Sequence, residues 1–182
     1  MKYISTRDNT KEYNFEQVFI KGLADDGGLY VPKTLKKFSA EELIKLKNLN
    51  YNALSAEIIS LFSEDFISKE ELLSLINKSY STFREKEVVK ISNVGEIKLL
   101  ELFHGPTLAF KDVAMQLIGN LYEYYLSKND KKINIVVATS GDTGAAAIDA
   151  IKGKSNLNIF VLHPNKRISS VQRKLMTTVE EK

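Results

Sequence analysis

The segment INIVVATSGDTGAAAIDAIKGKSNLNIFVL, residues 133–162, decides the fold of this chain. It opens with a largely apolar run at 133–138, continues with a small-residue stretch at 145–151 that ends before Gly153, and closes with a second apolar run at 159–162. Short apolar runs bounded by turn residues are typical of strands, and the middle stretch is typical of a helix. The order predicts a βαβ unit with a buried parallel sheet and a right-handed crossover.

Helix signals dominate the part of the chain that precedes this unit. Ser39 is followed by Glu42, and Ser68 is followed by Glu71. Each pair matches the capping box, in which a hydroxyl and a carboxylate bond to the first free backbone amides of a helix. Because apolar residues at helical spacing follow both boxes, we expect a mostly helical region at 35–85.

The pattern then changes to strands mixed with helices. Two β-rich runs at 88–92 and 97–103 predict a hairpin or bend, and apolar residues at helical spacing predict a helix at 111–126. We therefore expect two domains, a mostly helical one at 1–85 and the start of an α/β domain at 86–182.

The composition is that of an ordinary globular protein. The 182 residues include 26 Lys and Arg against 23 Asp and Glu, so a net charge of +3 without a long basic run gives no reason to expect nucleic acid as a partner. The chain has no Cys and two His, which excludes disulfides and thiolate metal sites and leaves little material for a zinc site. No signal peptide or long apolar stretch is present, so we expect a cytoplasmic chain without a membrane span.

One candidate site is the loop TSGDTG at 139–144, between the first predicted strand and its helix. Backbone amides and hydroxyls at such a turn converge where the helix dipole favours an anion, and the two glycines permit close approach. The alternative is structural, since Asp142 can simply cap the helix. The loop matches neither the dinucleotide fingerprint nor the P-loop, which argues against a nucleotide.

A second candidate is Lys111, at the end of the segment HGPTLAFK and at the predicted start of a helix. The positive end of the helix dipole is an unfavourable place for an ammonium, and partial burial beside Phe110 acts in the same direction. A neutral amine is a nucleophile that can attack an aldehyde and later move a proton. The alternative is that Lys111 extends into water, as most lysines at helix starts do.

These motifs resemble those of one family. The segment LFHGPTLAFKD at 102–112 is similar to the cofactor-lysine motif of threonine synthases, and TSGDTGAA at 139–146 is similar to their second motif. The likeness extends to GLADDGGLYVP at 22–32 and to ISSVQRK at 168–174, so it covers essentially the whole chain.

The resemblance implies an incomplete fold type II pyridoxal-phosphate domain after an N-terminal helical region. It implies Lys111 as the catalytic residue, joined to pyridoxal 5'-phosphate as a Schiff base, with Phe110 and Asp142 also next to the cofactor. In many fold type II relatives an Asn that contacts the phenolic oxygen of the ring stands in place of Asp142. The residues expected to bind the substrate are Ser140, Gly141, Asp142, Thr143 and Gly144.

The implied activity is that of a lyase of threonine biosynthesis, which converts O-phospho-L-homoserine and water into L-threonine and phosphate. Threonine synthases are much longer than this chain, and their glycine-rich loop for the cofactor phosphate lies further on. We therefore expect an N-terminal fragment that binds pyridoxal phosphate weakly and has little or no activity alone. An incomplete sheet also favours self-association.

Two alternatives stay open at this point. Threonine dehydratase and cysteine synthase share the lysine and the anion loop, although the His-Gly-Pro-Thr context of 104–107 favours threonine synthase. The other alternative is a non-catalytic anion-binding α/β module, or a remnant that has kept the fold without the chemistry.

Overall fold

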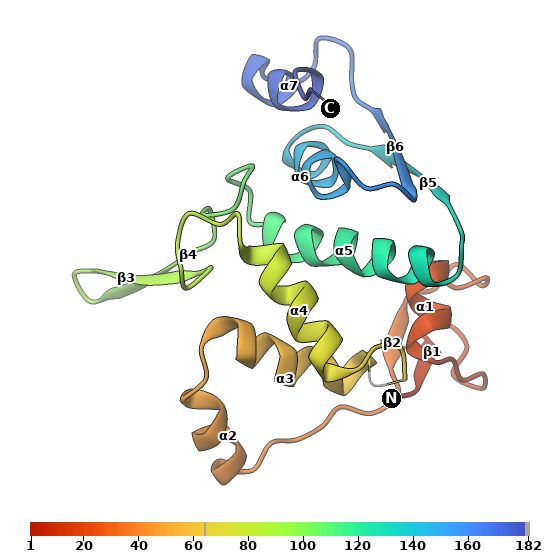
Figure 1. Ribbon diagram of the computed structural model, residues 1–182, viewed down its shortest axis with the longest axis vertical. Helices are drawn as coiled ribbons and strands as arrows, with labels where there is room; N and C mark the ends of the chain where they lie inside the picture. The colour runs from red at the N-terminus through yellow and green to blue at the C-terminus, as the bar shows by residue number, and fades with distance from the viewer. Residues whose placement is uncertain (64, 181–182) are drawn as a thin grey trace. The chain divides into compact units, whose positions relative to one another are not determined.

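The computed structural model describes residues 1–63 and 65–180 and shows a mixed α/β chain (Figure 1). Within these residues seven helices and six strands form two compact units, Met1–Ile76 and Asn77–Lys182. The α/β fold class expected from the sequence is confirmed. None of the described helices combines the length and the apolar character that a membrane crossing needs.

The first unit is built on a short antiparallel strand pair. Strand β1 (Tyr3–Ser5) pairs with β2 (Tyr30–Pro32), and helix α1 (Phe15–Lys21) lies between them in sequence. Asn14 and Gln17 form a capping box that begins α1. The Tyr3 hydroxyl donates a hydrogen bond to the Phe62 carbonyl at 2.8 Å, and burial raises the pKa of Tyr3 to about 12.

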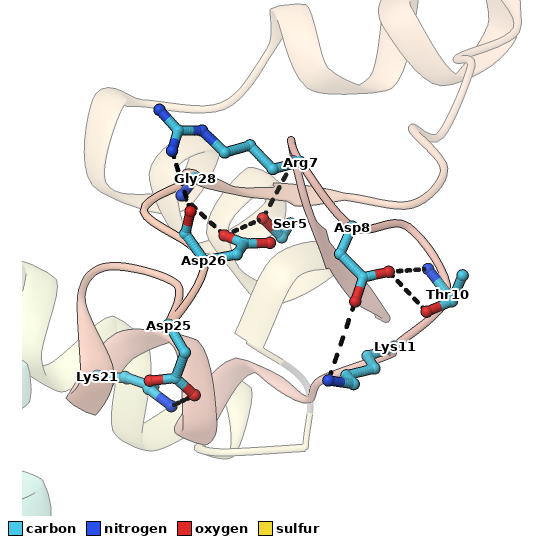
Figure 2. A network of polar contacts seen from close by, with 9 residues as sticks. All are labelled: Ser5, Arg7, Asp8, Thr10, Lys11, Lys21, Asp25, Asp26 and Gly28. Atoms are coloured by element: carbon cyan, nitrogen blue, oxygen red, sulfur yellow. Dashed lines mark hydrogen bonds and ion pairs between the residues drawn. The ribbon is translucent and has the colours of Figure 1, made fainter.

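The acidic turn between α1 and β2 is bound to the end of β1. Figure 2 shows the Asp26 carboxylate accepting hydrogen bonds from Ser5 Oγ and from the Gly28 backbone nitrogen, both at 2.8 Å. Arg7 donates to the Asp26 carbonyl at 3.0 Å. A Cβ on Gly28 would lie 2.3 Å from Ser5 Oγ, so this close approach requires glycine. The Ser5 bond lowers the pKa of Asp26.

Helices α2 (Ala40–Lys47), α3 (Tyr51–Ser63) and α4 (Lys69–Tyr80) follow. Both predicted capping boxes are confirmed. Ser39 Oγ accepts from the Glu42 nitrogen at 3.2 Å, and Ser68 Oγ accepts from the Glu71 nitrogen at 3.2 Å. Helix α4 continues across the division between the two units. The predicted domain boundary at residue 85 stays a prediction.

The second unit contains the predicted βαβ motif. Strand β5 (Ile133–Ala138) leads into helix α6 (Asp142–Ile151), and strand β6 (Leu157–Leu162) returns parallel to β5. Ala138 lies opposite Leu162 at the carboxyl ends of the two strands. Both strands therefore end at one edge, where the loop 139–144 leaves the sheet.

Helices cover one face of this two-stranded sheet. Ile135 and Val137 face α5 (Asp112–Lys128) and α6, whereas Ile159 and Val161 face α6 and the segment of α7 (Ser170–Thr177). The fully packed cluster under this face consists of Leu126, Ile151 and Leu157.

The other face of the sheet is exposed within the part of the chain that the structure describes. Val136, Phe160 and Leu162 are 65%, 56% and 62% exposed. The apolar runs predicted a sheet buried on both faces, but a run of apolar residues does not specify what covers its second face. Here the strands alternate between packed and exposed positions.

A β-hairpin precedes α5, as the sequence predicted. Strands β3 (Lys90–Val94) and β4 (Ile97–Glu101) pair antiparallel, with Gly95 at a φ of 62° in the turn. Figure 1 shows the hairpin extending away from α5 and α6. Its exposed large apolar residues are Ile91, Val94, Ile97, Leu99 and Leu100.

Candidate active site

Lys111 and Asp142 meet although 31 residues separate them. Lys111 is the residue immediately before α5, and its Nζ donates a hydrogen bond to Asp142 Oδ2 at 3.0 Å. The two side chains are 26% and 48% exposed, so the contact lies at the surface of the unit and is accessible to solvent. The bond from Lys111 lowers the pKa of the Asp142 carboxyl. The structure thus brings together two of the residues that the sequence singled out.

Phe110 contributes a second contact to the same nitrogen. The Lys111 Nζ lies 4.2 Å from the centroid of the Phe110 ring, within the range of a cation–π interaction. The ring itself is 58% exposed. The Lys111 nitrogen is therefore held between an aromatic face and a carboxylate.

The loop before Lys111 is fixed by a buried carboxylate that the sequence reasoning missed. Asp112 is 0% exposed, and it accepts bonds from the Thr107 nitrogen at 2.8 Å and from Thr107 Oγ1 at 2.6 Å. A Cβ on Gly105 would lie 2.4 Å from the Asp112 Cβ. Leu108, between these contacts, has a φ of 64°, which is strained for a non-glycine residue. The backbone conformation of this loop is thus determined by tertiary contacts and not by the local conformational preferences of its residues.

The start of this loop is anchored by a second polar group. His104 Nε2 lies 2.8 Å from Glu101 Oε2, and Ser92 Oγ donates to the same carboxylate. The Arg84 nitrogen donates to the His104 carbonyl at 2.9 Å. The bonds from Ser92 and His104 lower the pKa of Glu101. These contacts attach the His-Gly-Pro-Thr segment to the hairpin.

The loop 139–144 lies at the carboxyl end of β5, where it was predicted. The Thr139 nitrogen donates to the Leu162 carbonyl at 2.9 Å, which continues the sheet by one residue. The Gly141 nitrogen donates to Thr139 Oγ1 at 3.2 Å, and Gly141 begins α6 without a side-chain cap. Ser140 is exposed, whereas Gly141 and Gly144 are buried.

Both glycines of this loop pack against α7. A Cβ on Gly141 would lie 2.7 Å from Gln172 Nε2, and a Cβ on Gly144 would lie 2.5 Å from Met176 Sδ. Ser169 Oγ accepts from the Gln172 nitrogen at 3.2 Å and so begins α7. The sequence reasoning missed Gln172 as a neighbour of the loop. The Ser-x-x-Gln spacing at 169–172 is a capping pattern and could have indicated the helix start, but not the contact.

Helices α5 and α6 run side by side in the same direction. Their N-terminal ends meet through Lys111 and Asp142, and one to two turns further along Gln116 Nε2 donates a hydrogen bond to Asp149 Oδ2 at 2.7 Å. Parallel helices place two positive dipole ends at one position. The start of α6 therefore favours an anionic ligand more than a single helix end does.

These residues fit the group that the motifs imply. Pyridoxal phosphate is an anionic aldehyde, and it needs a lysine amine that it can reach. The Lys111 side chain is 26% exposed and lies beside a glycine loop and two helix N-termini. The residues present are thus compatible with the cofactor at this position.

The fold and this site define an α/β protein of the open-sheet class, which binds ligands outside the carboxyl ends of parallel strands. Residues 2–80 match the protein family described as "Threonine synthase N terminus". The threonine synthase of Pseudomonas aeruginosa is 43% identical over 180 residues, which are 98% of this chain and 38% of that protein. The chain belongs to the threonine synthase family, and it matches the N-terminal portion of its members.

Solved structures support the same assignment. The threonine synthase of yeast superposes with a TM-score of 0.93 at 42% identity, over 99% of this chain and 38% of that one. The pyridoxal-phosphate-bound threonine synthase of Brucella melitensis gives a TM-score of 0.91 at 42% identity, over 97% of this chain and 38% of that one. The chain therefore spans 38% of the length of these relatives.

Proposed function

We propose that this chain is the N-terminal portion of a threonine synthase, in which Lys111 holds pyridoxal 5'-phosphate. The observation that carries the proposal is the position of the Lys111 amine, 3.0 Å from Asp142 at the start of α6. In the proposal Lys111 acts as the nucleophile, next to the two helix N-termini that favour an anion. The relatives and the Brucella structure with its bound cofactor support the same reading.

Each residue has a stated role in this proposal. Lys111 binds the cofactor through its nitrogen and moves the proton at the substrate Cα. Phe110 and Asp142 contact the cofactor and orient it. The residues proposed to bind the substrate carboxylate are Ser140, Gly141, Asp142, Thr143 and Gly144. When bound, the cofactor supplies an electron sink for the charge that develops at Cα.

The proposed reaction converts O-phospho-L-homoserine and water into L-threonine and phosphate, as a cytoplasmic step of amino-acid biosynthesis. We propose in addition that the 182-residue chain alone binds the cofactor weakly and turns over little substrate. The support is its coverage of 38% of the relatives, because a site assembled from a longer chain has fewer of its contacts here.

The cofactor proposal is tested by titrating the chain with pyridoxal phosphate and following the visible absorbance of the lysine-bound cofactor. Borohydride reduction and peptide mapping then locate the adduct. Lys111→Ala is expected to abolish the specific adduct. Lys128→Ala is the matched control, because Lys128 lies on the same helix with its nitrogen 4.2 Å from the Tyr124 ring. Labelling scattered over many lysines would agree with weak binding by the chain alone, whereas scattered labelling in a chain completed with the C-terminal portion of a relative would count against the proposal.

The reaction is tested in a chimera that joins this chain to the remaining C-terminal portion of the Pseudomonas aeruginosa relative. Release of phosphate together with L-threonine from O-phospho-L-homoserine is expected, and the Lys111→Ala chimera should release neither. Conversion of L-threonine into an oxo acid and ammonia would instead assign a dehydratase.

Self-association is a further part of the proposal. The exposed face of the β5–β6 sheet carries Val136, Phe160 and Leu162, and parallel sheets in α/β proteins are covered on both faces. We propose that a second copy of this chain covers that face in solution.

A further inference from the structure

The buried face of α5 carries a row of polar side chains. Asp112, Gln116 and Asn120 follow one another at intervals of four residues, about one helical turn, and all three are buried. A buried polar group is costly without a hydrogen-bond partner, and helices ordinarily pack through apolar side chains. Each of the three has its partner on a different segment of the chain. The position of α5 is therefore specified by directional bonds as well as by apolar contacts.

Gln116 bonds α5 to α6. Its Nε2 donates to Asp149 Oδ2 at 2.7 Å. Gln116 lies one turn from the first residue of α5, and Asp149 lies two turns from Asp142, the first residue of α6. Because a hydrogen bond weakens steeply with distance and angle, this pair opposes sliding of one helix along the other. Apolar side chains alone can repack after such a shift.

Asn120 adds a second connection one turn further along α5. Its Nδ2 donates to Ser79 Oγ on α4, and its Oδ1 accepts from Lys154 Nζ just beyond α6, both at 2.8 Å. The amide thus uses both of its ends, one toward each neighbouring segment. A shift of α5 would separate Asn120 from both partners and leave its buried amide unpaired, which is costly.

Lys111 directly precedes this row, and it meets Asp142 at the start of α6. A slip of α5 by one residue along α6 would move the Lys111 end of the helix by about 1.5 Å. We propose that Gln116 and Asn120 are positioning residues, whose bonds fix the axial register of α5 against α6 and thereby hold Lys111 at the α6 N-terminus. The use of this register in cofactor binding rests on the proposed function, whereas the register itself does not.

The register can be measured without the cofactor. The chain contains no Cys, so the cysteines introduced by Ala114→Cys and Lys152→Cys are its only thiols. Both positions are exposed, one near the start of α5 and one just after α6, and neither belongs to the proposed site. Nitroxide labels at these positions lie apart along the helix direction, so sliding changes the distance between them. Pulsed electron paramagnetic resonance gives this distance and its distribution in the 182-residue chain.

Gln116→Met keeps the length of the side chain and removes the donor. We expect the label distance to shift by about 1.5 Å or more, or its distribution to widen by that amount. Asn120→Leu removes both bonds of the amide and should act in the same way. Asp149→Asn is the matched control, because asparagine retains an oxygen that accepts from Gln116, and it should leave the distribution unchanged. An unaltered distribution in both Gln116→Met and Asn120→Leu would overturn the proposal.

A double variant separates register from stability. Gln116→Met together with Asp149→Leu replaces the bonded pair by an apolar pair, and such a replacement can be nearly neutral for stability. We expect the midpoint of urea denaturation to lie close to that of the unchanged chain, while the label distribution stays altered. A label distribution that returns to that of the unchanged chain would show that Gln116 only fills space, whatever the midpoint, and would overturn the proposal.

The consequence for Lys111 is measured in the same chimera that tests the reaction. After pyridoxal phosphate and borohydride, we expect the yield of adduct at Lys111 relative to Lys128 to fall about threefold or more in Gln116→Met and to stay within about twofold in Asp149→Asn. Altered label distances with an unchanged yield at Lys111 would overturn the positioning role. If the distances respond but the unsubstituted chimera shows no preference for Lys111, the proposed function fails and the register stands. If every variant of the chimera prefers Lys111 and the distances do not respond, the proposed function stands and this inference fails.

Discussion

The buried carboxylate of Asp112 is bonded twice to Thr107, through the backbone nitrogen at 2.8 Å and through Oγ1 at 2.6 Å. Burial raises the pKa of Asp112, and the two bonds from Thr107 oppose this effect. The pair joins the loop that carries Leu108 and Phe110 to the first residue of α5. The position of Lys111 therefore depends on a contact that does not involve Lys111 itself.

Thr107→Val tests this contact. Valine keeps the branched shape but removes the hydroxyl donor, so one bond to a fully buried carboxylate is lost. We expect the free energy of unfolding to fall by about 1–3 kcal/mol, measured by urea denaturation. Thr107→Ser retains the hydroxyl and should lose less than half of that amount. Equal midpoints for Val and the unchanged chain would show that the bond contributes little.

Gly119→Ala tests the contact between α5 and α6. Alanine is favoured over glycine by about 1 kcal/mol inside a helix, but a Cβ here would lie 2.4 Å from the Ala150 carbonyl oxygen. Because that oxygen is backbone, we expect a net loss of about 1–3 kcal/mol in urea denaturation. Ala114→Gly, at an exposed position of the same helix, measures the helix preference alone. A stabilised Gly119→Ala chain would contradict the observed close packing.

The Glu101 carboxylate predicts a dependence of stability on acid. Its pKa is lowered from the ordinary value of 4.5 by bonds from Ser92 and His104. A lowered carboxyl pKa stabilises the folded state above the unfolded value, and this contribution is lost as the pH falls through the folded value. Glu101→Gln should therefore be less stable than the unchanged chain near pH 6, and the difference should shrink as the pH falls below the ordinary value of 4.5 and through the lowered folded value. A difference that persists unchanged in acid would contradict this assignment.

The exposed face of the β5–β6 sheet is tested by sedimentation. The unchanged chain should gain mass with concentration, and Phe160→Ser should shift it toward the monomer, because the substitution removes a large apolar group that is 56% exposed. Ile91→Ser is the matched control, since Ile91 is 65% exposed on the β3–β4 hairpin. A monodisperse monomer at high concentration would refute self-association.

The local elements were predictable from the sequence because their signals are local. Ser39 and Glu42 lie three residues apart, and their capping box depends on the geometry of one helical turn. The apolar run at 133–138 and the helix after it similarly defined the βαβ unit. The motif likeness also singled out Lys111.

The contacts between distant side chains were not predictable in this way. The pairing of Lys111 with Asp142 depends on how α5 packs on α6, and the contact of Gly141 with Gln172 depends on the path of the chain to α7. Sequence spacing carries no information on these distances. For the same reason the apolar residues of β6 did not indicate that Phe160 is exposed.

The close approach of Gly119 to Ala150 sets how closely α5 and α6 can pack. It lies about two helical turns from the start of each helix, where Lys111 and Asp142 meet. A bulkier side chain at position 119 would push α6 away from α5, and the N-terminal ends of the two helices would then move relative to each other. We therefore expect substitutions at Gly119 to change the distance between Lys111 and Asp142, although Gly119 touches neither residue.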